Sequence, residues 1–420
     1  MDSIKVLVIG SSAFANNIIA KLLKDKNTQE LEIISVTDKE TIFNHVEPII
    51  IPNFDIDKII EIALARRVSL TIPCEASLFS LGIVDKFKEL GLNIFGPDQA
   101  SSRLESSKFF FKEFTHSHSI PSPNYASFES KEMSLVYLQN IQYPVLIQPD
   151  NLFEREYENK QFIAENFEEA KSFVELYYSK LYLCNSAKRL IIEEYSKSDH
   201  ISFTVIYDGD NAFSLVPIKN NYEFNKLSFS FSEMTAFSSE DTLSPIIIDK
   251  ISQKIIQPCI DGFRKLKLKY SGFINFNCKV HEENDRVELL SINSCLSDLN
   301  SEISLQLLDE NLFDLLFACS QSKLAFYREG LHRKAEAAVA YNLIYDYSIL
   351  SSITDEEIES LEEKANTLGY KLQIKNRFDE INHRDLIQII NFANNQFEAK
   401  SFAQKTIKEL NLAGKEYIKE

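Results

Sequence analysis

The sequence predicts a chain of mixed α/β and α+β class, built from an α/β domain at the N-terminus, an α+β domain in the middle and a smaller domain at the end. Short apolar strands alternate with helical patterns over residues 1–100, as in a doubly wound parallel sheet, and strands then dominate. The length of 420 residues exceeds what one hydrophobic core usually serves. Because 44% of the residues are hydrophobic, each domain has enough apolar side chains for a core.

The N-terminal domain begins with an apolar strand at residues 3–10, which ends in glycine. A helical pattern follows at residues 13–23, giving a strand, a turn and a helix. The alternation continues with strands expected at 31–36 and 69–72 and helices expected at 56–65 and 81–90. We expect residues 1–100 to form one Rossmann-like domain.

The middle domain is expected over residues 101–325, as two subdomains at roughly 120–190 and 191–325. It opens with a helix predicted from Gln99 to about Ser117, with Ser101 or Ser102 as its N-cap. Helices are then expected at 166–179 and 249–266, and strands at 143–148, 189–195, 202–207, 227–231, 272–280 and 287–292.

The C-terminal domain is expected over residues 326–420. Its pattern mixes apolar strands with two helical stretches and has no internal repeat. The predicted elements are an apolar segment at 335–343, a helix at 355–368, strands near 371–374 and 386–393, and a helix from Ser401.

The charge balance disfavours two classes of partner. The chain has 45 Lys and Arg against 62 Asp and Glu, a net charge of -17 that repels nucleic acid and anionic lipid. We therefore expect neither a nucleic-acid nor a membrane partner. Without an apolar run of 18 residues or a signal-type start, we expect a cytoplasmic protein.

Glycine and cysteine usage limit the kinds of site. The chain has only 10 glycines, so it offers few places for a backbone loop that wraps phosphate. The six cysteines show no CxxC spacing, so we expect buried thiols rather than a zinc site or a disulfide framework.

Several motifs occur in the order found in one known family. They are S-L-T-I-P-C-E-A-S-L at 69–78, G-I-V-D at 82–85, I-F-G-P at 94–97, L-E-S-S-K at 104–108, Y-P-V-L-I at 143–147, I-I-E-E-Y at 191–195, S-I-N at 291–293 and L-A-G-K-E-Y at 412–417. In this order they resemble the landmarks of phosphoribosylamine-glycine ligase (glycinamide ribonucleotide synthetase), an ATP-grasp enzyme of purine biosynthesis. The resemblance implies an ATP-grasp domain between a Rossmann-like domain and a small C-terminal domain.

The resemblance also implies a reaction and its cofactors. In the family, ATP converts the carboxylate of glycine to an acyl phosphate, which the amine of phosphoribosylamine attacks to give an amide, ADP and phosphate. ATP and magnesium are therefore the cofactors that the family implies, and no catalytic residue is assigned here. The implied binding residues are Lys108, Gln148, Glu193, Glu194 and Tyr195 for the nucleotide, Glu75 and Asp298 for the substrate, and Asn293 with Ser291 for the metal.

The metal motif departs from the family pattern. The family binds magnesium through the Glu and Asn of its E-F-N strand, and here Ser291 stands at the Glu position. Asn293 remains, but one neutral oxygen ligand holds magnesium poorly. Glu288 lies three residues before Ser291, so strand alternation predicts that the two side chains face opposite ways.

The phosphate-binding motifs depart as well. Gln148 stands where the family has lysine, and the following loop, 150–160, has no glycine and four acids. Lys160 or Arg155 is an open alternative as a substitute cation, although a solvated charged loop is the favoured interpretation. Three further motifs also depart from the family pattern. Family glycines are missing at 10–16 and 231–236, and the family arginine is missing at 295–300.

Three functions therefore remain open from the sequence. The first is a catalytically weak or inactive paralogue that binds a small molecule or another protein, since fold landmarks persist while phosphate-contacting residues are missing. The second is an active ADP-forming carbon-nitrogen ligase with an altered substrate. The third is a regulatory partner of an enzyme in purine metabolism, as a monomer or homodimer.

Overall fold

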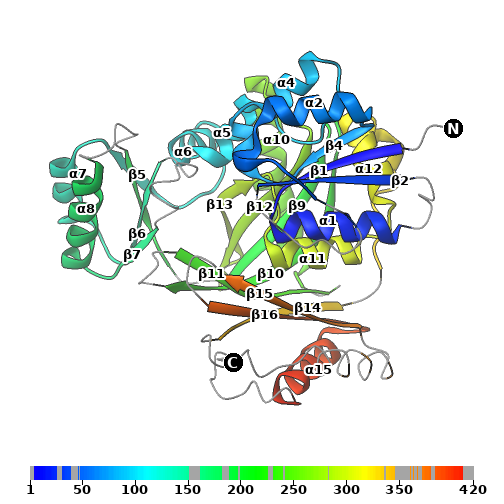
Figure 1. Cartoon of the computed structure of the whole chain (residues 1–420). Helices are drawn as coiled ribbons and strands as arrows, with labels where there is room; N and C mark the ends of the chain where they lie inside the picture. The colour runs from blue at the N-terminus through cyan, green and yellow to red at the C-terminus, as the bar shows by residue number, and fades with distance from the viewer. Residues whose placement is uncertain are drawn as a thin grey trace.

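The structure is a computed structural model with three sheets and helices packed on them (Figure 1). It describes residues 4–25, 31–38, 46, 48–150, 161–181, 189–196, 199–225, 230–239, 242–281, 283–334, 337–345, 360, 363, 367, 371–379 and 384–409. No helix among these residues is long and apolar enough to cross a membrane.

The N-terminal domain is a parallel four-stranded sheet in the order β3-β2-β1-β4. Its central strand is fully buried from Val6 to Ile9 because helices cover the sheet on both faces. This confirms the doubly wound α/β prediction. The elements are β1 (Ile4–Ile9), α1 (Ala13–Lys24), β2 (Leu31–Thr37), β3 (Pro48–Ile50), α2 (Ile56–Arg66), β4 (Leu70–Pro73), α3 (Ala76–Ser80) and α4 (Ile83–Glu89).

The helix predicted from Gln99 to Ser117 is two helices, α5 (Gln99–Ser106) and α6 (Lys108–Ser117). Ser107 has extended backbone angles, and its hydroxyl accepts a hydrogen bond from the N–H of Phe110, so it ends one helix and caps the next. The predicted N-cap was also wrong. Asp98 caps α5 instead, by accepting the N–H of Ser101 at 2.8 Å.

The first subdomain of the middle domain is an antiparallel sheet in the order β5-β8-β6-β7. Two helices cover its outer face, at the left of Figure 1. Apolar residues of both helices and of the sheet form one core, which includes Leu138, Val174 and Ile192. The elements are β5 (Tyr125–Phe128), α7 (Lys131–Leu138), β6 (Val145–Pro149), β7 (Phe162–Ala164), α8 (Phe167–Leu181) and β8 (Leu190–Glu194).

The largest sheet has eight strands in the order β13-β12-β9-β10-β11-β14-β16-β15. Helices α9 and α10 pack on one face of it, and α11 packs on the other. The elements are β9 (Asp199–Tyr207), β10 (Ala212–Asn225), β11 (Ser230–Ser238), α9 (Pro245–Ile251), a π-helical turn (Ser252–Ile256), α10 (Gln257–Leu266), β12 (Gly272–His281), β13 (Arg286–Asn293), α11 (Asp298–Leu307) and α12 (Leu312–Ser320).

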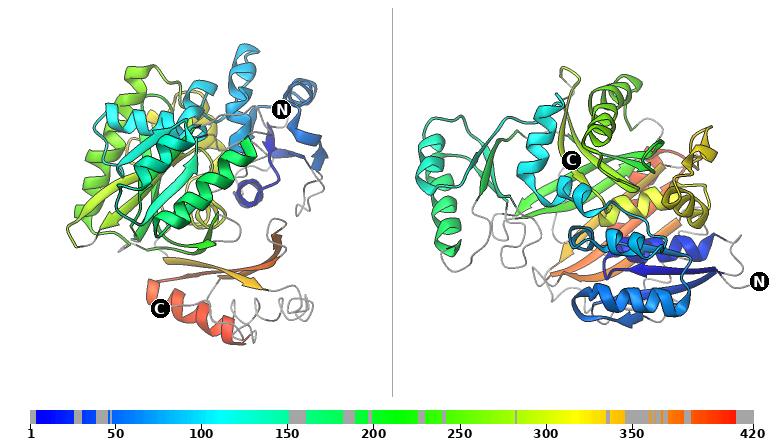
Figure 2. Two further views of the ribbon diagram at one scale, coloured as in Figure 1. Left: turned by 90° about the vertical axis from the view of Figure 1, so that its left-hand side faces the viewer. Right: turned by 90° about the horizontal axis from the view of Figure 1, so that it is seen from above.

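The C-terminal strands extend this same sheet, because β14 pairs with β11 in antiparallel register. Helix α15 packs against β14 and β16 at the far end of the molecule (Figure 2). The elements are β14 (Ala337–Tyr345), β15 (Lys371–Asp379), β16 (Arg384–Ala393) and α15 (Gln396–Glu409). The helix predicted at 355–368 falls mostly outside the described residues.

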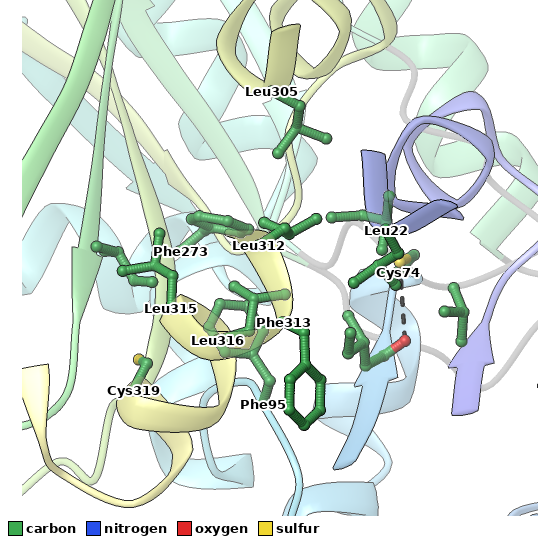
Figure 3. Packing of buried hydrophobic residues seen from close by; sticks show 14 of the residues in the cluster. Leu22, Cys74, Phe95, Phe273, Leu305, Leu312, Phe313, Leu315, Leu316 and Cys319 are labelled. Carbon is green, nitrogen blue, oxygen red and sulfur yellow. Dashed lines mark hydrogen bonds between the residues drawn. The ribbon is translucent and has the colours of Figure 1, made fainter. Parts of the chain in front are cut away.

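A shared apolar core joins the N-terminal domain to the large sheet (Figure 3). The ring of Phe273 on β12 packs edge-on against Phe95, with the ring centroids 5.0 Å apart. Close by, the N–H of Gly96 donates to the carbonyl of Ser271 at 2.7 Å. The N-terminal domain is therefore seated directly on the sheet that carries the candidate site.

Gly272 packs against the backbone of Gly96 at this junction, and we expect Gly272→Ala to destabilise the fold. A Cβ at this position would lie 3.0 Å from the Cα of Gly96, so the Gly96 backbone has to give by a few tenths of an ångström. Overpacking of this kind costs about 1–3 kcal/mol in unfolding free energy, measurable by urea titration. A change below about 0.5 kcal/mol, the usual size for a surface substitution, would contradict this tight junction.

Candidate nucleotide cleft

A cleft of about 230 Å³ lies between the two subdomains of the middle domain. Strands β6 and β8 line it from one subdomain, and β9, β10, β12 and β13 line it from the other. Its lining residues are Lys108, Pro123, Leu146, Gln148, Gln161, Glu193, Glu194, Tyr195, Ser196, His200, Tyr222, Asn277, Lys279, Leu290 and Ser291. The structure thus brings together all five residues predicted to contact the nucleotide.

The segment between the subdomains, residues 193–196, is called the hinge below. Two of its N–H groups are bonded within the protein, that of Glu194 to the carbonyl of Asn124 at 3.0 Å and that of Tyr195 to Pro144 at 3.2 Å. The backbone N–H of Ser196 has no hydrogen-bond partner among the described residues, and Ser196 lines the cleft. Among the described residues, the hinge therefore has one backbone N–H without a protein partner.

Glu193 is held inside the protein rather than presented to a ligand. Its carboxylate forms a buried ion pair with Lys112 of α6 at 2.5 Å, in which Lys112 is fully buried. It also accepts a hydrogen bond from the amide of Gln148, whose own oxygen accepts from Gln161 at 3.1 Å. Gln148 therefore hydrogen-bonds to Glu193 within the protein. The family resemblance implies a phosphate-binding lysine at this position.

Lys108 is a lysine that lines the cleft and is 9% exposed. Its backbone N–H donates to the carbonyl of Asp150 at 3.0 Å, while its ammonium group forms no hydrogen bond or ion pair with the described residues. Burial lowers the pKa of its ammonium group, while the nearby Glu193 acts in the opposite direction. A second lysine of the cleft, Lys279, donates to the hydroxyl of Ser196.

The prediction that Glu288 faces away from Ser291 was wrong. Ser291 pairs with Asn277 and Glu288 pairs with Lys279, with a register shift between the two pairs. Since Asn277 and Lys279 are two residues apart, they share a face of β12, and their partners share it too. Leu290 is the extra residue of a β-bulge in β13. Because of this bulge, the side chain of Glu288 lies on the same face of the strand as that of Ser291.

Glu288 is nevertheless bound to its own hairpin. Its carboxylate contacts the guanidinium of Arg286 and hydrogen-bonds to Nε2 of His281 at 3.0 Å. These hydrogen bonds and the neighbouring Arg286 hold the pKa of Glu288 below its usual range, against the effect of burial. Glu288 therefore does not replace the carboxylate missing at Ser291.

Neutral side chains fill the predicted metal position. The amide of Asn277 donates to Asn293 Oδ1 at 2.6 Å and to Ser291 Oγ at 2.8 Å. Its own oxygen accepts from Ser202 and Asn275, each at 3.1 Å. We call this set, with its continuation from Ser202 to Asn300 and Asn220, the amide network.

The amide network ends at a buried carboxylate, Glu105 of α5. Glu105 accepts from Asn293 Nδ2 at 3.0 Å and from the N–H of Ser294 at 2.9 Å. Burial raises the pKa of its carboxyl, and the hydrogen bonds oppose this rise. Both functional atoms of Asn293 are thereby engaged with protein groups.

These residues do not fit a magnesium ion. Magnesium needs an octahedral set of oxygens, usually with at least one carboxylate. Here Asn293 Oδ1 accepts two hydrogen bonds, from Asn277 and Ser291. No group of three or more His, Cys, Asp or Glu in the described part of the chain is placed to hold a metal.

The predicted substrate residues Glu75 and Asp298 do come together, but among other acids. Burial is the main cause that raises the pKa of Glu75, and the charges of Asp38 and Asp298 also raise it. Glu75 accepts the N–H of Ser11 at 3.0 Å, and the Ser11 hydroxyl donates to Asp38 at 2.6 Å.

The start of the predicted phosphate loop is also used structurally. The carboxylate of Asp150 accepts the N–H of Phe109 at 2.7 Å and the hydroxyl of Ser107 at 2.9 Å, which places it at the N-terminus of α6. The remaining loop residues, with Arg155 and Lys160, lie outside the described residues.

Comparison with known proteins identifies the family. Residues 4–105 match the N domain of phosphoribosylglycinamide synthetase, and residues 106–301 match its ATP-grasp (A) domain. The chain belongs to the phosphoribosylamine-glycine ligase family. The match covers the N-terminal sheet and all the residues that line the cleft.

Individual relatives agree with this assignment. The chain is 27% identical to a phosphoribosylamine-glycine ligase of Clostridium acetobutylicum over 376 residues, 88% of each chain. By fold it resembles an ADP complex of N5-carboxyaminoimidazole ribonucleotide synthetase (TM-score 0.69, 11% identity, 98% and 97% of the chains). It also resembles the Thermotoga maritima phosphoribosylamine-glycine ligase (TM-score 0.65, 16% identity, 96% of each chain). These neighbours confirm the ATP-grasp fold.

Sequence reasoning missed the residues that close the metal position. Asn277 lies in an ordinary strand pattern. Glu105 lies within the L-E-S-S-K motif, where only Lys108 was assigned a role, and its partner Asn293 is 188 positions away in the sequence. Lys112 was missed likewise, although a lysine on an apolar helix face is a signal that a buried partner exists.

The raised pKa of Glu105 gives a testable pH dependence. A folded-state pKa above the unfolded value means that the folded protein binds the extra proton, so stability rises as pH falls toward the ordinary carboxyl value of 4.5. We expect the unfolding free energy of the wild type, relative to Glu105→Gln, to increase from neutral pH to 4.5 and then level off. A relative change in the opposite direction would contradict the assignment. Urea titrations across this range provide the measurement.

Proposed function

We propose that this chain is a ligase-deficient member of the phosphoribosylamine-glycine ligase family that serves as a ligand-binding protein. The fold and the cleft of the family persist, and Lys108 and the hinge line this cleft. The groups that would neutralise a magnesium-bound triphosphate are replaced by neutral or hydrogen-bonded side chains.

The observation that carries this proposal is the amide network. Phosphoryl transfer depends on electrostatic stabilisation by a metal ion and cations around the transferring group. Asn277 Nδ2 instead lies 2.6 Å from Asn293 Oδ1, so a hydrogen-bond donor points at the oxygen that would bind the metal. A hydrogen-bond donor and a cation cannot share that side of one oxygen.

The second candidate, an active ligase with an altered substrate, has less support. It requires substitute cations at the phosphates, and the sequence candidates Arg155 and Lys160 lie outside the described residues. Among the described residues, the cations that line the cleft are Lys108 and Lys279, and Lys279 donates a hydrogen bond to Ser196.

The proposal is tested by assaying glycinamide ribonucleotide formation from phosphoribosylamine, glycine and MgATP. The Clostridium acetobutylicum relative, prepared in the same way, serves as the positive control. We expect no product from this chain above the uncatalysed rate. Turnover in the ordinary enzyme range, about 1–10³ per second, would overturn the proposal.

A further inference from the structure

We infer that the chain has a second small-molecule site, separate from the cleft, which takes a compact neutral molecule with an apolar ring system and one hydroxyl group. The site is a pocket of about 300 Å³ between β10 and the C-terminal end of α11, called the bulge pocket below. Among the described residues, it shares no lining residue with the cleft. Its apolar lining includes Phe203, Leu215, Val216, Ile248, Leu307 and Leu308.

The bulge pocket lies where β10 departs from regular pairing with β9. The register shifts between Ser214 and Pro217, so that three steps along β10 match two along β9. Pro217 has no N–H to donate to the ladder, and prolines within sheets are confined to edges and such irregularities. A bulge redirects the side chains beside it. Both Leu215 and Val216, which are neighbours in the sequence, therefore line the pocket.

The rim of the pocket is held in place by backbone hydrogen bonds. The N–H of Asp309 donates to the carbonyl of His332 at 3.1 Å, and the N–H of Lys334 donates to the carbonyl of Leu307 at 2.9 Å. These bonds join residues 331–334 to the end of α11. The pocket is thereby formed without a ligand, as is usual for small-molecule sites.

The group that indicates a ligand is the hydroxyl of Ser304 on α11. Ser304 lines the pocket and is 1% exposed, and its Oγ is buried without a hydrogen-bond partner among the described residues. Buried hydroxyl groups are normally hydrogen-bonded, and an unsatisfied one costs free energy. Because a serine side chain has several staggered rotamers, its hydroxyl can turn to meet a polar group of the ligand.

The distribution of charge favours a neutral ligand. The charged residues that line the pocket, His332 and Arg333, are exposed and therefore lie at its rim. His332 is bonded through Nδ1 to the carboxylate of Glu310 at 2.7 Å. A charged group placed beside Ser304 would be buried among apolar side chains without an opposite charge, which is costly.

The volume sets the size of the ligand. A dry apolar cavity of about 150 Å³ is large enough to hold benzene. The bulge pocket has about twice that volume. Two fused aromatic rings with one small substituent match it.

The test is a fluorescence titration of the full chain with 1-naphthol, 1-methylnaphthalene and 1-naphthoate. The chain has no tryptophan, so fluorescence excited beyond the tyrosine band comes from the probe. We expect both neutral probes to bind, and 1-naphthoate to bind about tenfold more weakly than 1-naphthol because its charge is not paired. Ser304→Ala should weaken 1-naphthol about fivefold, the value of one hydrogen bond, without weakening 1-methylnaphthalene.

A second variant locates the binding. Ser214 is exposed on β10 and lines the pocket, so Ser214→Phe should fill the pocket and abolish binding of both neutral probes. The matched control is Ser172→Phe, the same change at an exposed serine of α8, which should alter none of the affinities. Circular dichroism establishes that each variant is folded.

Four results would each rule out the inference. They are a wild type that binds neither neutral probe, a folded Ser214→Phe variant with wild-type affinities, a Ser304→Ala variant that does not weaken 1-naphthol selectively, and 1-naphthoate that binds more tightly than 1-naphthol. Ser304→Ala makes a small change, so it decides the question even if Ser214→Phe fails to fold.

Discussion

Lys112→Met is expected to destabilise the protein by about 3–5 kcal/mol in unfolding free energy, because it leaves the carboxylate of Glu193 buried without its cation. The lysine is fully buried and the carboxylate nearly so, with 2.5 Å between the charged atoms. Gln148 still donates to Glu193, but a neutral amide does not replace a full charge. Urea unfolding followed by circular dichroism measures the loss.

A double variant separates this cause from lost packing. Lys112→Met combined with Glu193→Leu removes both charges and should recover most of the stability, since a buried ion pair replaced by apolar residues is often neutral. The exposed pair of Lys86 and Asp57 is the control, where Lys86→Met should cost no more than about 1 kcal/mol. A Lys112→Met variant as stable as that control would contradict the buried pair.

Asn277→Leu is the second substitution with a large expected effect. Asn277 makes four hydrogen bonds within the amide network, to Ser202, Asn275, Ser291 and Asn293. Removal of the Asn277 amide leaves each of these four side chains short of one hydrogen bond in a largely buried region. Each unsatisfied buried polar group costs about 1–3 kcal/mol in unfolding free energy. We expect a total loss above about 3 kcal/mol in unfolding free energy.

Asn221→Leu is the matched control, because Asn221 is an exposed residue of β10 in the same sheet. A surface change of this kind should stay within about 0.5 kcal/mol. If Asn277→Leu is no more destabilising than Asn221→Leu, the amide network is not the stabilising set that its geometry indicates.

The fold was largely predictable from the sequence because its signals are local. The parallel sheet follows from apolar strands alternating with helices, and residues 143–148 and 272–280 were expected as strands where β6 and β12 lie. The break between α5 and α6 was missed because Ser107 has the same polarity as a solvent-facing helix residue. Only its cap geometry distinguishes it.

The site was predictable in position but not in its internal pairing. Lys108, Gln148 and the hinge were placed in one cleft by collinear motifs, and the structure agrees. The side on which Glu288 lies depended on one bulge residue, which alternation cannot anticipate. The hydrogen bond from Asn293 to Glu105 joins residues that are 188 positions apart in the sequence, so no local sequence pattern indicates it.

The central claim is that the family's metal position is closed by the amide network. Titration of Mn²⁺ in the presence of ATP, followed by electron paramagnetic resonance, tests this most directly, with the Clostridium acetobutylicum relative as the positive control. The account predicts that this chain leaves the Mn²⁺ spectrum as that of MnATP free in solution, while the relative broadens it. Stoichiometric Mn²⁺ binding to this chain, displaced by Mg²⁺ and abolished by Asn293→Leu, would contradict the account.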